Sequence, residues 1–216
     1  MNNTKGNKYD FKEFSNSNTI NDLDKIIKKT GEKLEGNCLY QHLCKLTFKY
    51  HLDNKEDLRY NIHTICKYRN SILEVGFNGG HSVALYLYSN PNIFIRSFDI
   101  CIHKYTEECA NYFKKLKNFE FVKGNSMITL KEHKADRIFE IIHIDGGHGY
   151  NIAKNDLVEC KKFSNKNTIL IFDDAYHPPL KNLLEEYIKL KFIKEVNYMD
   201  LNLRVTKFHR IFNYVF

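Results

Sequence analysis

Three aspartates and a histidine lie in two short motifs that could support metal-assisted proton removal. The first motif, I-D-G-G-H, places Asp145 three residues before His148, and the second contains the pair Asp173 and Asp174. Carboxylates that crowd together repel one another unless a cation joins them. Oxygen ligands of this kind suit Mg²⁺, which keeps several waters and leaves places for substrate oxygens. An imidazole with a pKa near neutrality can take a proton from such a substrate.

Each of these residues also has a plainer interpretation. An acid at a strand end often caps the next helix, and Asp145 could contact a cofactor without metal. His148 could hydrogen-bond across the Gly-Gly turn. Asp156 is interpreted as a solvated helix acid, with orientation of His148 as the alternative. His177 could line a pocket, although a lone loop histidine is usually structural.

A glycine-containing turn after the apolar run 71–75 predicts a cofactor site. Residues 74–82 read E-V-G-F-N-G-G-H-S. Gly76 and Gly80 allow close backbone approach because neither carries a Cβ atom. The helix that follows presents free N–H groups and a positive potential to an anionic group of the ligand.

This turn does not form the nicotinamide-binding fingerprint G-x-G-x-x-G. Counted from Gly76, the second and third glycines are replaced by Asn78 and His81. An acid instead stands two residues before the first glycine, at Glu74. Asp99 ends the next apolar run, and its carboxylate can accept hydrogen bonds from both hydroxyls of a ribose. The pattern therefore indicates a nucleoside that is not a nicotinamide dinucleotide.

The elements that position these residues follow from alternating apolar runs and helical stretches. Strands are predicted at 71–75, 93–98, 119–123, 139–144 and 168–172. Helices are predicted near 80–89, 105–117, 126–133 and 149–163. This alternation favours an α/β fold with a parallel sheet and helices on both faces. Pro178 and Pro179 open a further helix. The last two strands, 192–199 and 204–215, have no room for a helix between them and predict an antiparallel hairpin.

Residues 1–50 are predicted to precede a domain formed by 51–216. The segment 1–20 is rich in Asn, Lys and Ser, which favours disorder. We expect 32–50 to form a helical lid that covers the active site and selects the acceptor. Ordinary packing of an N-terminal helix on the sheet is the alternative.

The length, charge and cysteine content of the chain favour some classes of protein over others. The chain has 216 residues, a net charge of +7 and six cysteines without a C-x-x-C pair. Without a secretory signal, this predicts free, mostly buried thiols and a cytoplasmic location. No apolar run reaches the ~18 residues of a membrane span. The positive charge is spread along the chain, which disfavours nucleic acid without excluding it. A homo-oligomer is compatible with the sequence.

The glycine turn resembles class I S-adenosylmethionine-dependent methyltransferases of the group with an E-I-G-F-N-x-G-H-S motif. The resemblance extends from Glu74 to about Asp174 and implies a Rossmann-like, mostly parallel seven-stranded sheet. It implies that the methionine part is surrounded by Gly76, Phe77, Asn78, Gly80, His81 and Ser82, supported by Glu74. It also implies that Asp99 holds the ribose. Asn125 and Ser126 resemble the adenine-side G-D-S motif, with Asn125 in place of the usual Asp.

The I-D-G-G-H-x-Y and D-D motifs resemble metal-dependent O-methyltransferases that act on sugar or catechol hydroxyls. That resemblance implies Asp145, Asp173 and Asp174 as metal ligands and His148 as general base, with Asp145 also near the cofactor. The predicted function is Mg²⁺-dependent O-methylation of a small-molecule hydroxyl. The alternatives are an RNA or protein methyltransferase, and a non-methylating relative that is hydroxylase-like or a cofactor-binding regulatory protein.

Overall fold

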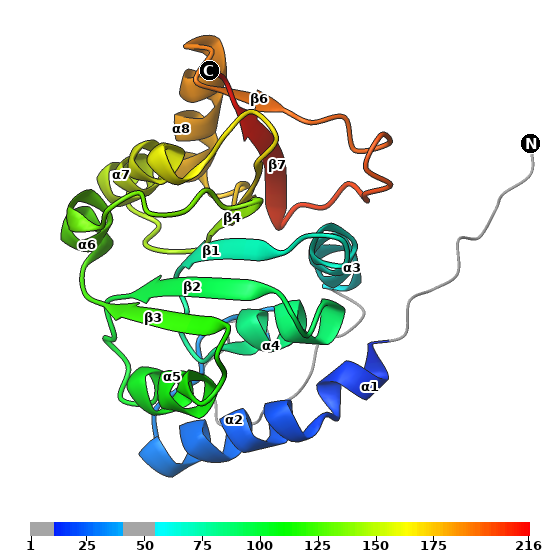
Figure 1. Ribbon diagram of the computed structural model, residues 1–216, viewed down its shortest axis with the longest axis vertical. Helices are drawn as coiled ribbons and strands as arrows, with labels where there is room; N and C mark the ends of the chain where they lie inside the picture. Colours follow the sequence, from blue (N-terminus) through cyan, green and yellow to red (C-terminus); the bar gives the residue numbers. More distant parts are fainter. Residues whose placement is uncertain (1–10, 41–54) are drawn as a thin grey trace, which may run out of the picture.

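The computed structural model describes residues 11–40 and 55–216, whose strands form one sheet (Figure 1). The strands are β1 (Ser71–Val75), β2 (Phe94–Asp99), β3 (Phe119–Lys123), β4 (Ile141–Ile144), β5 (Ile169–Asp173), β6 (Ile193–Glu195) and β7 (His209–Tyr214). Their order across the sheet is β3-β2-β1-β4-β5-β7-β6. β1 to β5 are mutually parallel, whereas β7 is antiparallel to both β5 and β6. The predicted fold class, including the C-terminal antiparallel pair, is confirmed.

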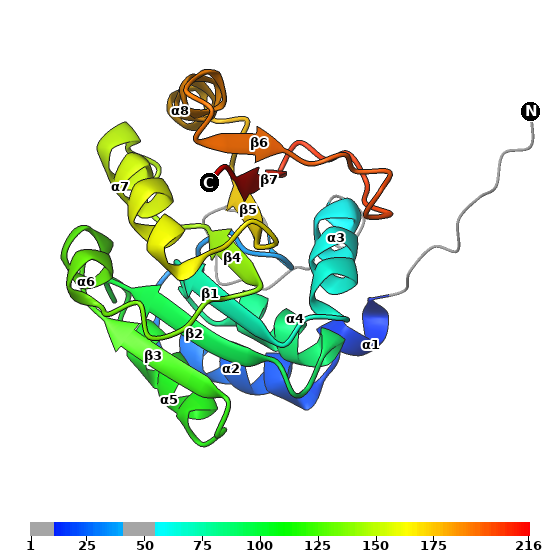
Figure 2. The ribbon, with the colours of Figure 1, turned by 45° about the horizontal axis from the view of Figure 1, so that its top comes forward.

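Helices cover both faces of this sheet. They are α1 (Lys12–Ser15), α2 (Asn18–Thr30), α3 (Glu56–Cys66), α4 (His81–Ser89), α5 (Thr106–Lys114), α6 (Ser126–Glu132), α7 (Tyr150–Cys160) and α8 (Pro178–Lys189), with a 3₁₀ turn at Lys161–Phe163. Figures 1 and 2 show α3, α4 and α5 on one side and α6, α7 and α8 on the other. Each face has its own hydrophobic core. α2 packs against α4 and α5 on the first side.

The central strands are buried on both faces, as helices on both sides require. All five residues of β1 and all four of β4 are buried. The apolar runs therefore locate the strands well, and the predicted ranges shift by two residues or less at β1 to β5. The helix predicted over 105–117 ends at Lys114 and is followed by a turn. β6 and β7 are shorter than predicted and are joined by the long connection 196–208.

The N-terminal segment is more ordered than its polar composition predicts. The prediction of disorder over 1–20 is wrong for residues 11–20, and residues 1–10 lie outside the described part. Phe11, Phe14 and Ile20 are buried in the core on the α4 side. These three apolar side chains attach α1 and the start of α2, because burying them outweighs the polar average of the segment.

Five cysteines lie in the described residues and all have free thiols, as predicted. They are Cys38, Cys66, Cys101, Cys109 and Cys160, of which Cys101 alone is partly exposed. The sixth, Cys44, lies outside the described residues. Across the described helices, none combines the length and apolar character needed to cross a membrane.

Candidate functional site

A cavity of about 1150 Å³ opens at the carboxyl ends of the five parallel strands. The loops after β1 to β5 contribute Gly76, Gly124, Asp145 and Asp174 to its wall, together with Asp99 from the end of β2. β1 lies between β2 and β4, so the strand order reverses at this point in the sheet. Ligands of open α/β sheets bind beside such a reversal, beyond the carboxyl ends of the strands.

The turn between β1 and α4 brings its backbone against the end of β4. Gly76 has a φ of 99°, and a Cβ atom there would lie 2.0 Å from the carbonyl oxygen of Asp145. Gly80 precedes α4 with a φ of 77°, and its Cβ atom would lie 2.7 Å from the ring of Phe77. Glycine is therefore needed at both positions for conformational and steric reasons.

Asp99 holds this turn in place. Its carboxylate oxygens accept the backbone N–H groups of Asn78 at 2.8 Å and of Cys101 at 2.6 Å. The hydroxyl of Tyr105 donates to Oδ1 of Asn78 at 2.8 Å. Asp99 and Asn78 both line the cavity. A carboxylate offers about four lone-pair positions, so Asp99 can order the loop and still accept hydroxyl groups of a ribose.

Glu74 lies beneath the turn and does not border the cavity. Its fully buried carboxylate accepts hydroxyl groups from Ser82 at 2.5 Å, Ser97 at 2.6 Å and Tyr86 at 2.9 Å. Burial raises the pKa of Glu74, and these hydrogen bonds act against that rise. Glu74 and Ser82 thus join β1 to the first turn of α4, so they support the site from behind.

Phe77 and His81 are also buried and make their contacts below the turn. The ring of Phe77 packs edge-on against Phe113. Nε2 of His81 lies 3.5 Å from Oδ1 of Asp24 on α2. With Ser82, they border a small second cavity of about 20 Å³. These predicted cofactor residues shape the floor of the turn, and α2 contributes to it.

The turn after β3 forms the far wall of the large cavity. Oδ1 of Asn125 accepts the backbone N–H of Met127 at 3.0 Å and caps α6. Ser126 is the first residue of α6, and both Asn125 and Ser126 line the cavity. Behind them lies Asp156 of α7, which is fully buried. The interpretation of Asp156 as a solvated helix acid is therefore wrong, and burial raises its pKa to about 6.

Asp145, His148 and Asp174 form a compact group at the other end of the cavity. One ligand atom from each lies within 4.8 Å of the other two. Nε2 of His148 is 2.9 Å from Oδ2 of Asp174. This hydrogen bond raises the pKa of His148, with burial opposing it. Burial, followed by the negative charge of Asp173, raises the pKa of Asp145 well above its ordinary value.

Asp173 lines the cavity but does not belong to that group. Its Oδ1 atom lies 3.2 Å from Nε2 of His143 on β4 and 3.5 Å from Nδ1 of His209 on β7. Burial lowers the pKa of His143, but the charge of Asp173 outweighs it and raises the pKa to about 9. Burial of Asp173 is likewise overcome by His143, so the pKa of Asp173 is well below its usual range.

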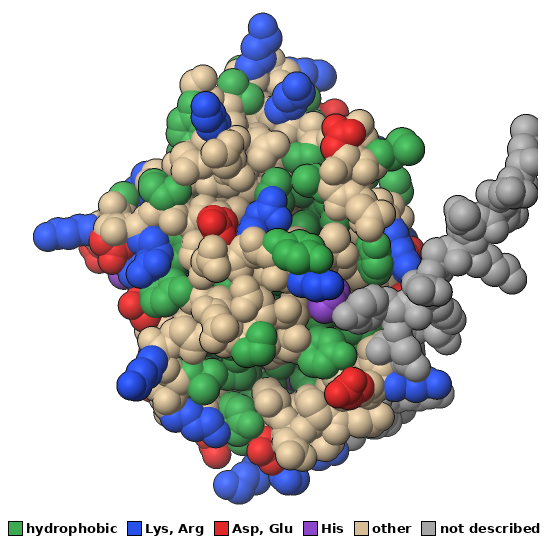
Figure 3. Space-filling model, turned by 45° about the vertical axis from the view of Figure 1, so that its right-hand side comes forward, with side chains coloured by type: hydrophobic (Ala, Val, Ile, Leu, Met, Phe, Trp, Pro, Cys, Tyr) green, Lys and Arg blue, Asp and Glu red, His purple; other side chains and the backbone are tan. Residues whose placement is uncertain are grey.

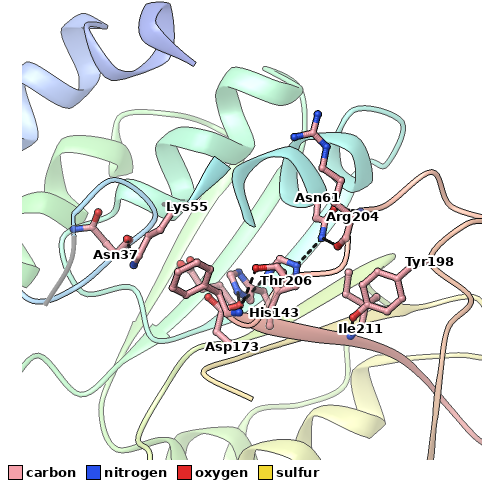
Figure 4. A network of polar contacts seen from close by, with 12 residues as sticks. Asn37, Lys55, Asn61, His143, Asp173, Tyr198, Arg204, Thr206 and Ile211 are labelled. Atoms are coloured by element: carbon pink, nitrogen blue, oxygen red, sulfur yellow. Dashed lines mark hydrogen bonds and ion pairs between the residues drawn. The ribbon is translucent and has the colours of Figure 1, made fainter. Parts of the chain in front are cut away.

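The two histidines extend this pairing into a buried polar network that the sequence motifs did not predict. The hydroxyl of Tyr86 contacts Nδ1 of His143 and donates to Glu74. On the other side, Asn61 of α3 lies 3.0 Å from Nε2 of His209. Figure 4 shows His143 and Asp173 together near Asn61. A histidine inside the apolar run F-E-I-I-H-I was the available sequence signal, because a strand buried on both faces rarely carries one.

The remaining wall of the cavity includes the N-terminal segment and the loop before β7. Residues 35–37 line it, and Nζ of Lys55 donates to the carbonyl oxygen of Asn37 at 2.5 Å (Figure 4). His177 and Phe208 also border the cavity. The predicted lid segment 32–50 is thus described only as far as residue 40, and residues 41–50 lie outside the described part of the chain.

Charged side chains are distributed without a dominant stripe on the face shown in Figure 3. Over its described atoms, Lys and Arg side chains are separated by hydrophobic and uncharged regions. This distribution agrees with the even spread of charge along the sequence.

Fold and site together resemble those of class I methyltransferases of the S-adenosylmethionine-dependent type. Residues 73–175 match the family model described as a methyltransferase domain. This range covers the glycine turn, Asp99, the I-D-G-G-H motif and the aspartate pair.

Solved structures share this fold across most of the chain. A methyltransferase from Podospora anserina, bound to S-adenosylhomocysteine, superposes with a TM-score of 0.65 at 11% identity, covering 92% of this chain and 88% of that one. An O-methyltransferase involved in tomaymycin synthesis, from Streptomyces achromogenes and in complex with S-adenosylmethionine, superposes with a TM-score of 0.61 at 11% identity, covering 92% of this chain and 90% of that one.

A curated protein matches a shorter segment. ASTRA-associated protein 1 of Candida glabrata is 26% identical over 115 residues, covering 50% of this chain and 24% of that protein. The chain therefore spans about a quarter of the length of that relative, and the match assigns no activity.

Proposed function

We propose that this chain transfers a methyl group from S-adenosylmethionine to a hydroxyl oxygen of a small molecule, with help from a divalent cation such as Mg²⁺. The observation that carries this proposal is the group of Asp145, His148 and Asp174 at the cavity. It combines an imidazole that can accept a proton with carboxylates that suit a hard cation. The O-methyltransferase activity in the name of the Streptomyces achromogenes neighbour agrees with it.

The cofactor orientation follows from the order of the strands. S-adenosylmethionine supplies an activated methyl group, whose S–CH₃ bond breaks as the O–CH₃ bond forms, leaving a neutral thioether. Asp99 on β2 accepts the ribose hydroxyls, and the base extends toward Ser126 after β3. The methyl end then points toward Asp145 after β4. This arrangement holds donor and acceptor in line, which is the main requirement for transfer from a sulfonium.

His148 is the general base in this proposal. Asp174 accepts the N–H of Nε2, which keeps the proton of the neutral imidazole on that nitrogen. Nδ1 then carries the free lone pair and takes the proton of the acceptor hydroxyl. The proton stays on His148 until it passes to solvent after transfer.

The donor set at this end of the cavity fits a divalent cation. Asp145 and Asp174 would hold it, because burial, and after it the negative charge of Asp173, makes the charged form of Asp145 unfavourable, which a cation would offset. A bound cation lowers the pKa of a hydroxyl that coordinates beside it. Oδ1 of Asp173 already lies beside His143 and His209. Asp173 is therefore not a ligand in this proposal, and its negative charge would attract the cation from a short distance.

Methyl transfer to a pool of catechols and sugars, followed with labelled S-adenosylmethionine, tests the activity. We expect turnover with Mg²⁺, loss with a chelator, and a fall of about 10²-fold or more in His148→Gln. His177→Gln is the matched control, because His177 borders the same cavity. Turnover that a chelator leaves unchanged would contradict the cation. Acceptance of RNA or protein, with no small-molecule product, would favour the alternative acceptors.

Calorimetry with Mn²⁺ alone separates the base from a metal ligand. We expect Asp174→Asn to weaken Mn²⁺ binding and His148→Gln to leave it nearly unchanged. Equal weakening in both variants would make His148 a ligand and contradict its role as base.

A further inference from the structure

Asp156 has a carboxylate oxygen that the described residues leave unsatisfied. Its side chain is fully buried on α7. Oδ1 accepts a hydrogen bond from Asn155 at 3.3 Å, whereas Oδ2 has no hydrogen-bond partner among the described residues. A buried carboxylate oxygen without a hydrogen-bond partner costs free energy of folding. An unpaired oxygen of this kind therefore calls for a specific explanation, such as a neighbouring donor that turns toward it.

This oxygen lies directly behind the cavity wall. A Cβ atom added to Gly146 would come 3.0 Å from Oδ2 of Asp156, and Gly146 lines the cavity. The hydroxyl of Ser126 interacts with the same carboxylate, and Ser126 also lines the cavity. Asn155 fixes the arrangement from the side, since its amide donates both to Asp156 and to the carbonyl oxygen of Ser126. Ser126 is therefore the link between the buried acid and a ligand.

The part of the ligand that reaches Ser126 is the base of the nucleoside. The reactive group of Asp145 and His148 follows β4, Asp99 ends β2, and Ser126 follows β3 at the edge of the sheet. A nucleoside with its ribose at Asp99 and its methyl end at Asp145 must extend its base beyond β2. The exocyclic amino group of adenine needs a hydrogen-bond acceptor there.

Asn125 is a poorer acceptor than its neighbour. Its Oδ1 atom already accepts the N–H of Met127 as the cap of α6, which leaves it one lone pair. A hydroxyl oxygen keeps both of its lone pairs when its proton is donated to another group. Ser126 is therefore the stronger candidate for the acceptor of the amino group.

We propose that Asp156 makes the site selective for a 6-aminopurine by orienting Ser126. The carboxylate accepts the hydroxyl proton of Ser126, so Oγ presents its lone pairs to the cavity and accepts the exocyclic amino group. Asp156 is a positioning residue, because it acts through Ser126. The inference rests on the proposed cofactor orientation.

A comparison of two ligands that differ only at position 6 of the purine tests this role. Dissociation constants for S-adenosylhomocysteine and for its 6-oxo counterpart, S-inosylhomocysteine, are measured by calorimetry on the full chain. We expect the wild type to favour the 6-amino ligand by about tenfold or more, the equivalent of one hydrogen bond. In Asp156→Asn the amide donates to Ser126, whose hydroxyl then points into the cavity. The preference should fall by about tenfold, mainly through tighter binding of the 6-oxo ligand.

Three further variants complete the test. Ser126→Ala should remove the same preference, and adding Asp156→Asn to it should change the ratio no further. Glu159→Gln, on the same helix and partly exposed, should retain the wild-type ratio. If Asp156→Asn weakens both ligands equally, Asp156 is merely structural and the inference is overturned. If the wild type binds neither ligand, the proposed function itself fails. Binding without purine preference in the wild type contradicts only the inference.

Discussion

Nε2 of His148 lies 2.9 Å from Oδ2 of Asp174 at the edge of the cavity. His148 is half exposed and follows β4, whereas Asp174 follows β5, so the pair joins the ends of two neighbouring strands. The hydrogen bond favours the charged imidazolium and raises the pKa of His148, against the opposing effect of burial. The pair therefore sets both the tautomer and the protonation of the proposed base.

Asp174→Asn should lower the pKa of His148, because the negative partner that stabilises the imidazolium is lost. NMR titration of the ring in metal-free protein should place the wild-type pKa above its ordinary value of 6.5 and the variant value below that of the wild type. His177→Gln is the control and should leave the titration in place. An unchanged pKa in Asp174→Asn would show that the two side chains do not pair in solution.

His143 should make the stability of the protein depend on pH. Its pKa rises from 6.5 to about 9 on folding, chiefly because the charge of Asp173 overcomes burial. Charged His143 therefore stabilises the folded state fully below pH 6.5, and this stabilisation is lost as the pH rises through about 9. The difference in urea stability between wild type and His143→Gln should shrink from about pH 6 to about pH 9. Buried thiols, present in both proteins, cancel in this difference. A constant difference contradicts a charged His143.

Glu74→Gln should destabilise the fold. The carboxylate accepts three hydroxyl groups within a dry core, and an amide offers one oxygen in its place. We expect the free energy of unfolding in urea to fall by about 2 kcal/mol. Ser97→Ala, which removes one of the three donors, should cost about 1 kcal/mol. Equal stability of Glu74→Gln and wild type would mean that Glu74 is protonated and already behaves as a neutral group.

Gly76→Ala should disrupt the cofactor turn. The added Cβ would lie 2.0 Å from the carbonyl oxygen of Asp145, which is backbone and cannot rotate away. We expect a loss of more than about 3 kcal/mol, measured by urea unfolding, and no detectable S-adenosylmethionine binding. Gly31→Ala is a matched control, because Gly31 also has a positive φ but nothing within 4 Å of its Cβ position. It should cost only about 1 kcal/mol. Similar losses in both variants would contradict the steric argument.

The fold was largely predictable because its signals are local. The apolar runs that became β1, β4 and β5 are buried on both faces, so each reads as a nearly continuous apolar segment. The N-terminal segment was not predictable in the same way. Phe11, Phe14 and Ile20 are isolated among polar residues, and their burial depends on a surface formed by distant helices.

Part of the site was predictable for the same reason. Gly76, Asp99, Asn125 and Asp145 reach the cavity because they stand at the ends of predicted strands. Glu74 stands near such an end too, yet lies within β1 and is buried below the turn. The burial of Asp156 depended on how α7 packs against α6, which no local pattern records.

The sequence by itself determined which acids and histidines come to the carboxyl edge of the sheet, since strand ends and glycine turns can be recognised from short stretches of neighbouring residues. Only the tertiary structure decided what two adjacent aspartates do there. Asp173 is the last residue of β5 and lies between His143 and His209, which belong to the neighbouring strands β4 and β7. Asp174 has left the strand with a φ of 51° and meets His148. The partners that separate these two roles are distant in sequence and meet only when the sheet forms.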